Sequence, residues 1–151
     1  SIQLVQTECS LPDDLEVNVR FHSEPNTASR WANALVVFDY RNESDYKFAG
    51  AFTGTNQWAI GRMTERGYVI ETQLCEEIDA KTGLEMQIAL EGDRVTVIAD
   101  GEVKVSHSFD DVSNQRPLGL SSYLATNRFE GFSVTGLSAD EDSSIDAELP
   151  G

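Results

Sequence analysis

The sequence predicts an all-β fold, a two-sheet antiparallel β-sandwich, and three observations support this prediction. Polar and apolar residues alternate with a period of two along most of the chain, as in residues 84–90, where every even-numbered residue is apolar. Turn residues separate the alternating runs at short intervals, and no window of eleven residues has helical spacing. About ten short strands in one chain of 151 residues indicate a sandwich or barrel with a full core.

The expected strands follow from this alternation in chain order. Residues 2–6 are expected to form an edge strand, and residues 16–22 (EVNVRFH) a half-buried one. Eight further strands are expected, the last of them interrupted by Gly131 between its two parts. These segments are residues 35–40, 46–52, 57–63, 68–74, 84–90, 94–99, 102–109 and the two parts of 128–137.

The turn between residues 94–99 and 102–109 has the strongest local signal. Asp100-Gly101 joins two alternating runs, and both residue types tolerate the positive φ that a type I′ turn requires. Glu91-Gly92-Asp93 predicts another turn just upstream. A ladder of three consecutive antiparallel strands is therefore expected over residues 84–109.

The composition changes after residue 137. The final segment, 138–151 (SADEDSSIDAELPG), contains five acidic residues and no basic residue, and it has almost nothing to bury. We therefore expect the sandwich to occupy residues 1–137, followed by an acidic tail or an interdomain linker at residues 138–151.

The formal net charge of −15, from 26 acidic and 11 basic residues, argues against nucleic acid and anionic membrane surfaces as partners. No apolar run approaches the ~20 residues of a membrane helix, so membrane insertion is not expected. Two interpretations of the acidity remain open, a solvated surface or a calcium site. The candidate calcium ligands lie around the turn near residue 43: Asp39, Asn42 and Asp45.

Two cysteines, Cys9 and Cys75, are too few for a zinc site or a disulfide-dense scaffold. A Cys9–Cys75 disulfide in a secreted protein and two free thiols both remain open.

Three groups of residues together resemble a known family. They are Phe38-Asp39-Tyr40 with 45–50 (DYKFAG) and 56–61 (NQWAIG), then 95–101 (VTVIADG), and finally Gly119-Leu120 with 128–132 (RFEGF). Their order and spacing, over most of residues 10–137, are similar to those of laminin-G-like domains of bacterial extracellular and adhesin-type proteins. These domains belong to the concanavalin A-like lectin and glucanase superfamily.

This resemblance implies a jelly roll of two antiparallel sheets with ligands on the concave sheet or at the loop rim. It also implies a non-catalytic module at the cell surface or outside the cell, within a larger bacterial protein beside neighbouring domains. Such modules bind glycans or extracellular protein ligands, sometimes with calcium, and others are spacers. Fold alone does not choose between these functions, so glycan binding and a spacer or protein-interaction role both remain open.

Sugar binding needs an aromatic face for the apolar side of the ring and planar polar groups for its hydroxyls. Two expected loops, residues 24–33 and 121–128, offer such groups, because binding residues concentrate in the loops at the ends of a sandwich. Trp31 is open to two interpretations, a surface platform or a cap on the core, whereas Trp58 is expected in the core. The predicted ligand-binding residues are Arg30, Trp31, Asn33, Tyr40, Arg62, Tyr123, Asn127 and Arg128.

The sequence argues against a hydrolase of the laminarinase type, and a diverged glycoside hydrolase stays a third alternative to the two binding and spacer roles. Glu77-Ile78-Asp79 begins the Glu-x-Asp-x-x-Glu run of the laminarinase-type glycoside hydrolases that share this fold, but Thr82 stands where the acid/base glutamate is required. His107 shares an expected core face with Val103, Val105 and Phe109, and His22 lies on the polar side of its strand, so they do not predict a catalytic pair.

Overall fold

The computed structural model describes residues 2–4, 14–25, 33–79, 83–110, 117–123, 125–136 and 144–145. These residues form two antiparallel sheets of six strands each. The first sheet has the order β1 (Ile2–Leu4), β10 (Gly119–Tyr123), β3 (Asn33–Asn42), β4 (Asp45–Phe52), β5 (Gln57–Thr64) and β6 (Gly67–Cys75). The second has the order β12 (Ser144–Ile145), β11 (Ala125–Gly136), β2 (Asp14–Pro25), β7 (Leu84–Glu91), β8 (Arg94–Ala99) and β9 (Glu102–Ser108).

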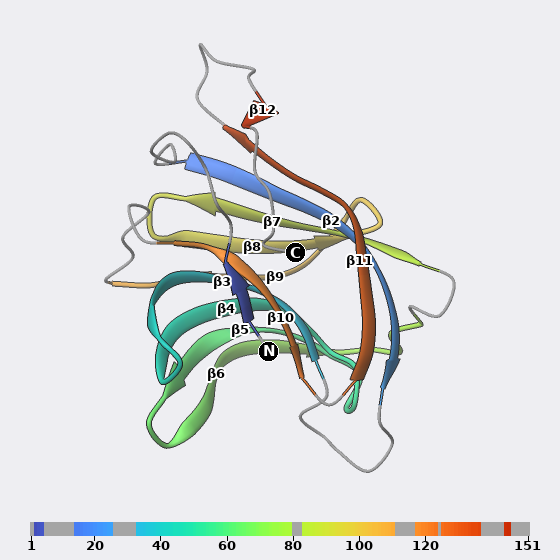
Figure 1. Cartoon of the computed structure of the whole chain (residues 1–151), viewed down its shortest axis with the longest axis horizontal. Coiled ribbons are helices and arrows are strands. Elements are labelled where there is room, and N and C mark those ends of the chain that lie inside the picture. The colour runs from blue at the N-terminus through green and yellow to red at the C-terminus, as the bar shows by residue number, and fades with distance from the viewer. Residues whose placement is uncertain are drawn as a thin grey trace.

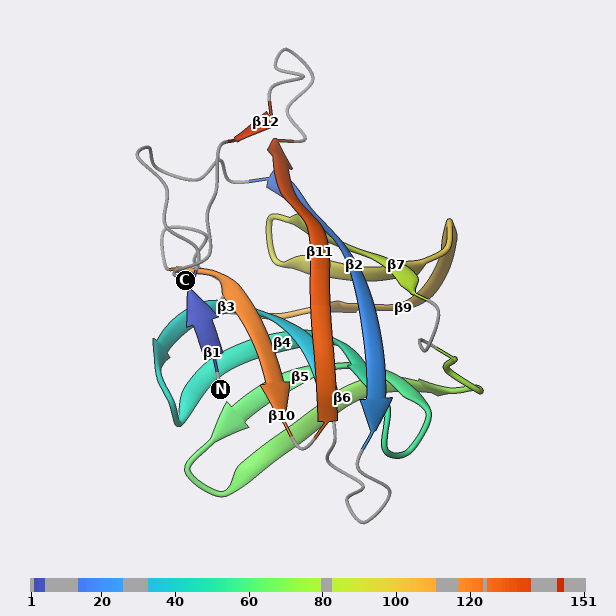
Figure 2. The same ribbon diagram turned by 45° about the vertical axis from the view of Figure 1, so that its right-hand side comes forward.

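The two sheets pack face to face, with β3 to β6 on one side and β2, β7, β8 and β11 on the other (Figure 1). Figure 2 shows β11 and β2 running side by side over most of their length. The two-sheet antiparallel β-sandwich predicted from the sequence is therefore confirmed. Strands β3 to β6 and β7 to β9 are sequential hairpins, whereas β10 returns from late in the chain to lie between β1 and β3.

Every strand expected from the alternation is present, with ends that differ by a few residues. Some predictions were wrong. Val103 was expected on the core face of its strand, but it is 61% exposed, beside the register shift between Val97 and Ile98. Residues 121–128 do not form a single loop, because β10 ends at Tyr123 and β11 begins at Ala125. The short β10 lacks a clear period-two pattern, GLSSY, and its pairing partners lie about 85 and 120 residues away in sequence. Gly131 does interrupt β11, where the register with β2 shifts between Glu130 and Ser133.

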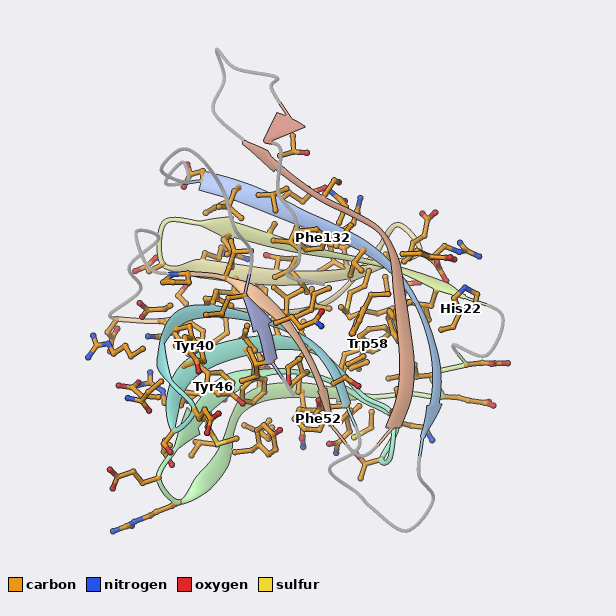
Figure 3. All side chains as sticks on the ribbon, in the orientation of Figure 1. His22, Tyr40, Tyr46, Phe52, Trp58 and Phe132 are labelled. Atoms are coloured by element: carbon orange, nitrogen blue, oxygen red, sulfur yellow. The ribbon has the colours of Figure 1, made fainter. Side chains whose placement is uncertain are left out.

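The central core lies between the sheets and contains the inward-facing residues of both. On β2 these are Leu15, Val17, Val19 and Phe21, which alternate with partly exposed residues as the sequence pattern predicts. Trp58 is 1% exposed and lies between the sheets (Figure 3), so its assignment to the core is confirmed.

The β8–β9 turn has the predicted form, because Asp100 and Gly101 both have positive φ, 48° and 82°. The Asp100 carboxylate also accepts a hydrogen bond from the backbone N–H of Glu85 on neighbouring β7 (3.2 Å). This contact joins the turn to the strand before it.

At the far edge of the second sheet, the short strand β12 pairs with Val134 and Thr135 of β11. Its two residues come from the segment that the sequence predicts as a tail or linker. The described residues contain no helix with the length and hydropathy needed to span a membrane.

Candidate functional site

The first sheet has a second buried cluster on the face turned away from the central core. The cluster has six buried members on β3, β4 and β5, and five partly buried residues pack against them. We call these residues the outer cluster: Leu35, Val37, Tyr46, Phe48, Phe52 and Ala59, with Ile2, Tyr40, Met63, Tyr68 and Ile70.

Aromatic rings connect the outer cluster along its length. Tyr40 stacks on Tyr46 with ring centroids 5.7 Å apart, and the two lie together at one end of the sheet in Figure 3. The ring of Tyr68 meets Phe48 and Phe52 edge to face, at 5.5 and 5.4 Å. Such arrangements suit the ring quadrupoles and stabilise beyond the apolar area that they bury.

A glycine makes room for this packing. A Cβ on Gly61 of β5 would lie 2.8 Å from the Phe48 ring and 2.1 Å from the carbonyl oxygen of Val69. The absence of a side chain at Gly61 therefore lets the Phe48 ring cross over β5 toward Tyr68.

Tyr40 reaches the outer cluster because of an irregularity in β3. Asp39 has a positive φ of 47°, and the β3–β4 register shifts between Phe38 and Asn42. In a regular strand Tyr40 would share the inner face with Phe38. The irregularity instead turns Asp39 inward, toward Lys47, and Tyr40 outward, against Tyr46.

Tyrosine hydroxyls supply most of the polar groups of this face. The pKa of Tyr46 is raised by burial, and then by the neighbouring Tyr68, Tyr40 and Glu43, so the phenol is neutral at physiological pH. The amide of Asn33 donates a hydrogen bond to the hydroxyl of Tyr68 (3.0 Å). Asn33 was predicted in a loop, but it is the first residue of β3 and is fully buried.

Charged residues of the same strands lie on the inner side. The Lys47 ammonium contacts the Asp39 carboxylate at 2.5 Å, and the two side chains are 8% and 1% exposed. Arg62, which pairs with Lys47 in the β4–β5 register, faces Glu71 at 3.4 Å. Both cations approach the Phe109 ring, at 5.6 and 5.4 Å from its centroid. The structure therefore does not bring Arg62 to the face that holds Tyr40.

A second polar contact links the sheets near β6 and β9. The Trp58 indole N–H donates to the Glu76 carboxylate (2.8 Å), and the Lys104 ammonium of β9 lies 2.6 Å from the same oxygen. Lys104 first, and then Trp58, hold the pKa of Glu76 below its ordinary value of 4.5. Glu76 in turn raises the pKa of Lys104 above 10.5.

The structure does not describe the side chains of the remaining predicted glycan-binding residues. Arg30 and Trp31 lie outside the described residues. For Tyr123, Asn127 and Arg128 only the strand register is described, which sets Tyr123 opposite Asn33, and Asn127 and Arg128 opposite Ser23 and His22. Their roles stay predictions.

The predicted calcium ligands have other contacts. Asp39 is buried against Lys47, the Asn42 side-chain oxygen accepts a hydrogen bond from the Ser44 backbone N–H (2.8 Å), and Asp45 lies 3.8 Å from Arg41. Within the described ranges, no three acidic, histidine or cysteine side chains gather where they could hold a metal ion. The calcium site stays a prediction.

The residues considered for catalysis are spread over the surface. Glu77 and Asp79 are exposed beside β6, and His22 contacts Glu130 at 2.8 Å on the second sheet. His107 packs against the edge of the Phe109 ring at 4.7 Å. Cys75 is a free, exposed thiol, and Cys9 lies outside the described residues.

The strand pattern alone did not identify a second packed face. Its members include Tyr46, Phe48, Phe52 and Tyr68. A signal for them is present in β4, whose residues 46–52 (YKFAGAF) are apolar on both faces apart from Lys47. A nearly continuous apolar run indicates a strand that is buried on both sides.

The fold is shared with known lectins and carbohydrate-binding modules. The carbohydrate-binding module CBM66 from Bacillus subtilis superposes with a TM-score of 0.68 and 13% identity, over 84% of this chain and 77% of that chain. A variant of human galectin-16 has a TM-score of 0.64 and 12% identity, over 87% and 94%. The Caenorhabditis elegans galectin LEC-6 has a TM-score of 0.57 and 7% identity, over 99% and 91%.

At such low identities these similarities describe the fold alone, a two-sheet antiparallel β-sandwich. No protein-family model matches the sequence, and no curated protein matches it either.

Proposed function

We propose that this chain is a carbohydrate-binding module without catalytic activity, and that the sugar binds at the aromatic outer face of the first sheet. The observation that carries the proposal is the outer cluster, in which partly exposed tyrosines lie over buried aromatic rings on a sheet face. Apolar sugar faces need such ring surfaces, and sugar hydroxyls need neighbouring polar groups. The hydroxyls of the partly exposed Tyr40 and Tyr68 supply such groups, and the buried Asn33 amide orients the Tyr68 hydroxyl through its hydrogen bond.

The similar structures support the same class of function. One of them is named a carbohydrate-binding module and others are galectins, and the described strands of this chain follow their sandwich over most of its length.

Binding to polysaccharides tests the proposal. The protein is mixed with a panel of insoluble and soluble polysaccharides, and bound protein is measured by sedimentation and by affinity gel electrophoresis. We expect retention on at least one polysaccharide, and we expect Tyr40→Ala to weaken it. Val103→Ala is the matched control, because Val103 is an exposed apolar residue of the other sheet. A folded protein that no polysaccharide retains would contradict the proposal.

A second candidate function is a spacer or protein-interaction domain, and one observation favours it. The exposed large apolar residues of the described chain lie on the edge strands of the two sheets, with Val69 and Leu74 on β6 and Val103 on β9. Strands β6 and β9 lie against each other, so this side of the sandwich offers apolar surface to a protein partner. Loss of partner binding in Leu74→Lys, with polysaccharide binding unchanged, would support this candidate.

We further propose an extracellular or cell-surface location within a larger bacterial protein, on the family resemblance described above. Fractionation of the source cells, with an antibody against this chain, tests the location.

A further inference from the structure

We propose that the outer face selects uncharged saccharide chains, stacking their rings on Tyr40 and Tyr68, and that it rejects acidic glycans. This inference rests on the proposed carbohydrate-binding function and names the class of ligand for the same face. It comes from the distribution of charge over the two sides of the first sheet.

No residue of the outer cluster carries a charge, although a quarter of all residues in the chain are charged. The positions that the register adds beside the cluster are also uncharged, with Gln73 opposite Ala59 on β6 and Ser121 opposite Leu35 on β10. The polar groups on this face are therefore hydroxyls and amides.

The cations of β4 and β5 cannot serve an anionic ligand on this face. Lys47 is turned inward against Asp39, and Arg62 lies on the same inner side beside Glu71. At the end of the sheet, Arg41 lies 3.8 Å from the carboxylate of Asp45.

The turns at this end of the sheet carry both signs of charge, with Arg41, Glu43 and Asp45 at the β3–β4 turn and Glu65 and Arg66 at the β5–β6 turn, so the excess of negative charge is a property of the whole chain. Glu43 in the β3–β4 turn is one of the groups that raise the pKa of Tyr46, and the whole chain has a formal charge of −15. An acidic glycan would approach against this potential and would find no basic side chain among the described residues of the face. An uncharged chain meets no such barrier.

Two rings are placed to receive the ligand. Phe48 and Phe52 are at most 1% exposed, whereas Tyr40 and Tyr68 are partly exposed. Tyr40 stacks on the buried Tyr46 ring, and Tyr68 meets Phe48 and Phe52 edge to face. The faces of Tyr40 and Tyr68 offer stacking surface and their hydroxyls offer hydrogen bonds. Because two separate rings are partly exposed, a saccharide chain that stacks on both should bind more tightly than a single sugar.

Affinity gel electrophoresis with two sets of soluble polysaccharides tests the inference. The uncharged set contains a glucan, a mannan, a galactan and a fructan, and the acidic set contains polygalacturonate, alginate and heparin. We expect retardation by at least one uncharged polymer, with an affinity that changes less than about twofold between 20 and 500 mM NaCl, because no ion pair contributes. Acidic polymers are expected to cause no retardation at either salt concentration.

Variants locate the binding. Tyr40→Ala is expected to lower the affinity about tenfold, the loss of one stacked ring, and Tyr40→Phe is expected to lose less because the ring remains. Val103→Ala is expected to bind as the wild type does. Thermal unfolding of each variant confirms that it is folded. Tyr68→Ala, which removes the second stacking ring, is expected to lower the affinity as well and gives a second measurement if Tyr40→Ala does not fold.

The outcomes separate this inference from the proposed function. Salt-sensitive binding to acidic polymers would overturn the inference and leave the carbohydrate-binding function in place. Binding to uncharged polymers that folded Tyr40→Ala and Tyr68→Ala proteins retain in full would overturn the assignment to this face. No binding to either set would contradict the proposed function itself.

Discussion

At the scale of single residues, the inner side of the first sheet depends on one buried ion pair. Lys47 and Asp39 are almost fully enclosed, so each charge needs the other for compensation. Asp39 also has a positive φ, which aspartate and asparagine tolerate better than most residues. The same residue therefore turns the strand and neutralises the lysine.

Breaking this pair should destabilise the protein strongly. Lys47→Met leaves the Asp39 carboxylate buried beside an apolar side chain, and we expect a loss of about 3–5 kcal/mol in the free energy of unfolding. In the double variant Lys47→Met with Asp39→Asn, no charge is left uncompensated and asparagine still accepts the positive φ, so most of the loss should be recovered. Urea unfolding of the wild type, the single variant and the double variant measures these changes in the free energy of unfolding. Equal losses in the single and double variants would contradict the role of the pair.

The Glu76 carboxylate should make stability depend on pH. Its pKa is lower in the folded protein than the ordinary 4.5, so its contribution is present above pH 4.5 and is lost as the pH falls through the folded value. Glu76→Gln should therefore be less stable than the wild type at pH 7, and the difference should shrink on acidification below pH 4.5. Urea unfolding midpoints of the wild type and of Glu76→Gln, taken from pH 7 to pH 3, measure this difference in stability.

Glu77→Gln is the matched control, because Glu77 is exposed next to Glu76 and its loss removes the same charge. If both variants respond to pH alike, the contacts of Glu76 with Trp58 and Lys104 contribute nothing particular.

At the scale of elements, local sequence determines the hairpins and distant residues determine the strand irregularities. The β8–β9 turn follows from Asp100-Gly101 alone, because its positive φ values are a local requirement. The irregularity at Asp39 has no comparable sequence signal. It occurs where Asp39 meets Lys47 across the strand pair and where the Tyr40 backbone N–H bonds to the carbonyl of Pro117 (3.3 Å).

Variants at two glycines separate the cost of backbone strain from the cost of a steric collision. A Cβ on Gly101 would meet nothing within 4 Å, so Gly101→Ala tests only the cost of its positive φ, about 1–2 kcal/mol. Gly101→Asn should cost less, because asparagine tolerates this region. Gly61→Ala should cost more than either, since its Cβ would lie 2.1 Å from the Val69 carbonyl oxygen. Thermal and urea unfolding rank the three, and a different order would contradict this assignment of causes.

At the scale of the whole molecule, the net charge and the packing of apolar residues have separate effects. The formal charge of −15 is carried by a fold whose two sheets enclose one core and whose first sheet carries a second apolar cluster outside it. Like charges repel one another in the folded state, and salt screens this repulsion. The acidity therefore acts on stability and on partner choice, whereas the fold follows from the apolar pattern.

The predicted calcium binding can be tested by thermal unfolding. If the predicted calcium site exists, millimolar calcium should raise the melting temperature of the EDTA-treated protein, because a ligand at 100 times its Kd adds roughly 2.7 kcal/mol. For a domain of this size that corresponds to a rise of roughly 5–10 °C. Magnesium at the same concentration is the control for general screening. Equal effects of the two ions would contradict a specific site and favour the solvated-surface interpretation.

The sequence by itself determined the β class, nearly all the strands and the β8–β9 turn, because alternation and turn chemistry depend on neighbouring residues. It also placed Trp58 in the core. Only the tertiary structure decided which face of the first sheet holds Tyr40, Arg62 and Asn33, and that β10 lies between β1 and β3. Alternation says that neighbouring side chains point to opposite faces. When both faces are apolar, only contacts between distant strands decide which face meets the other sheet.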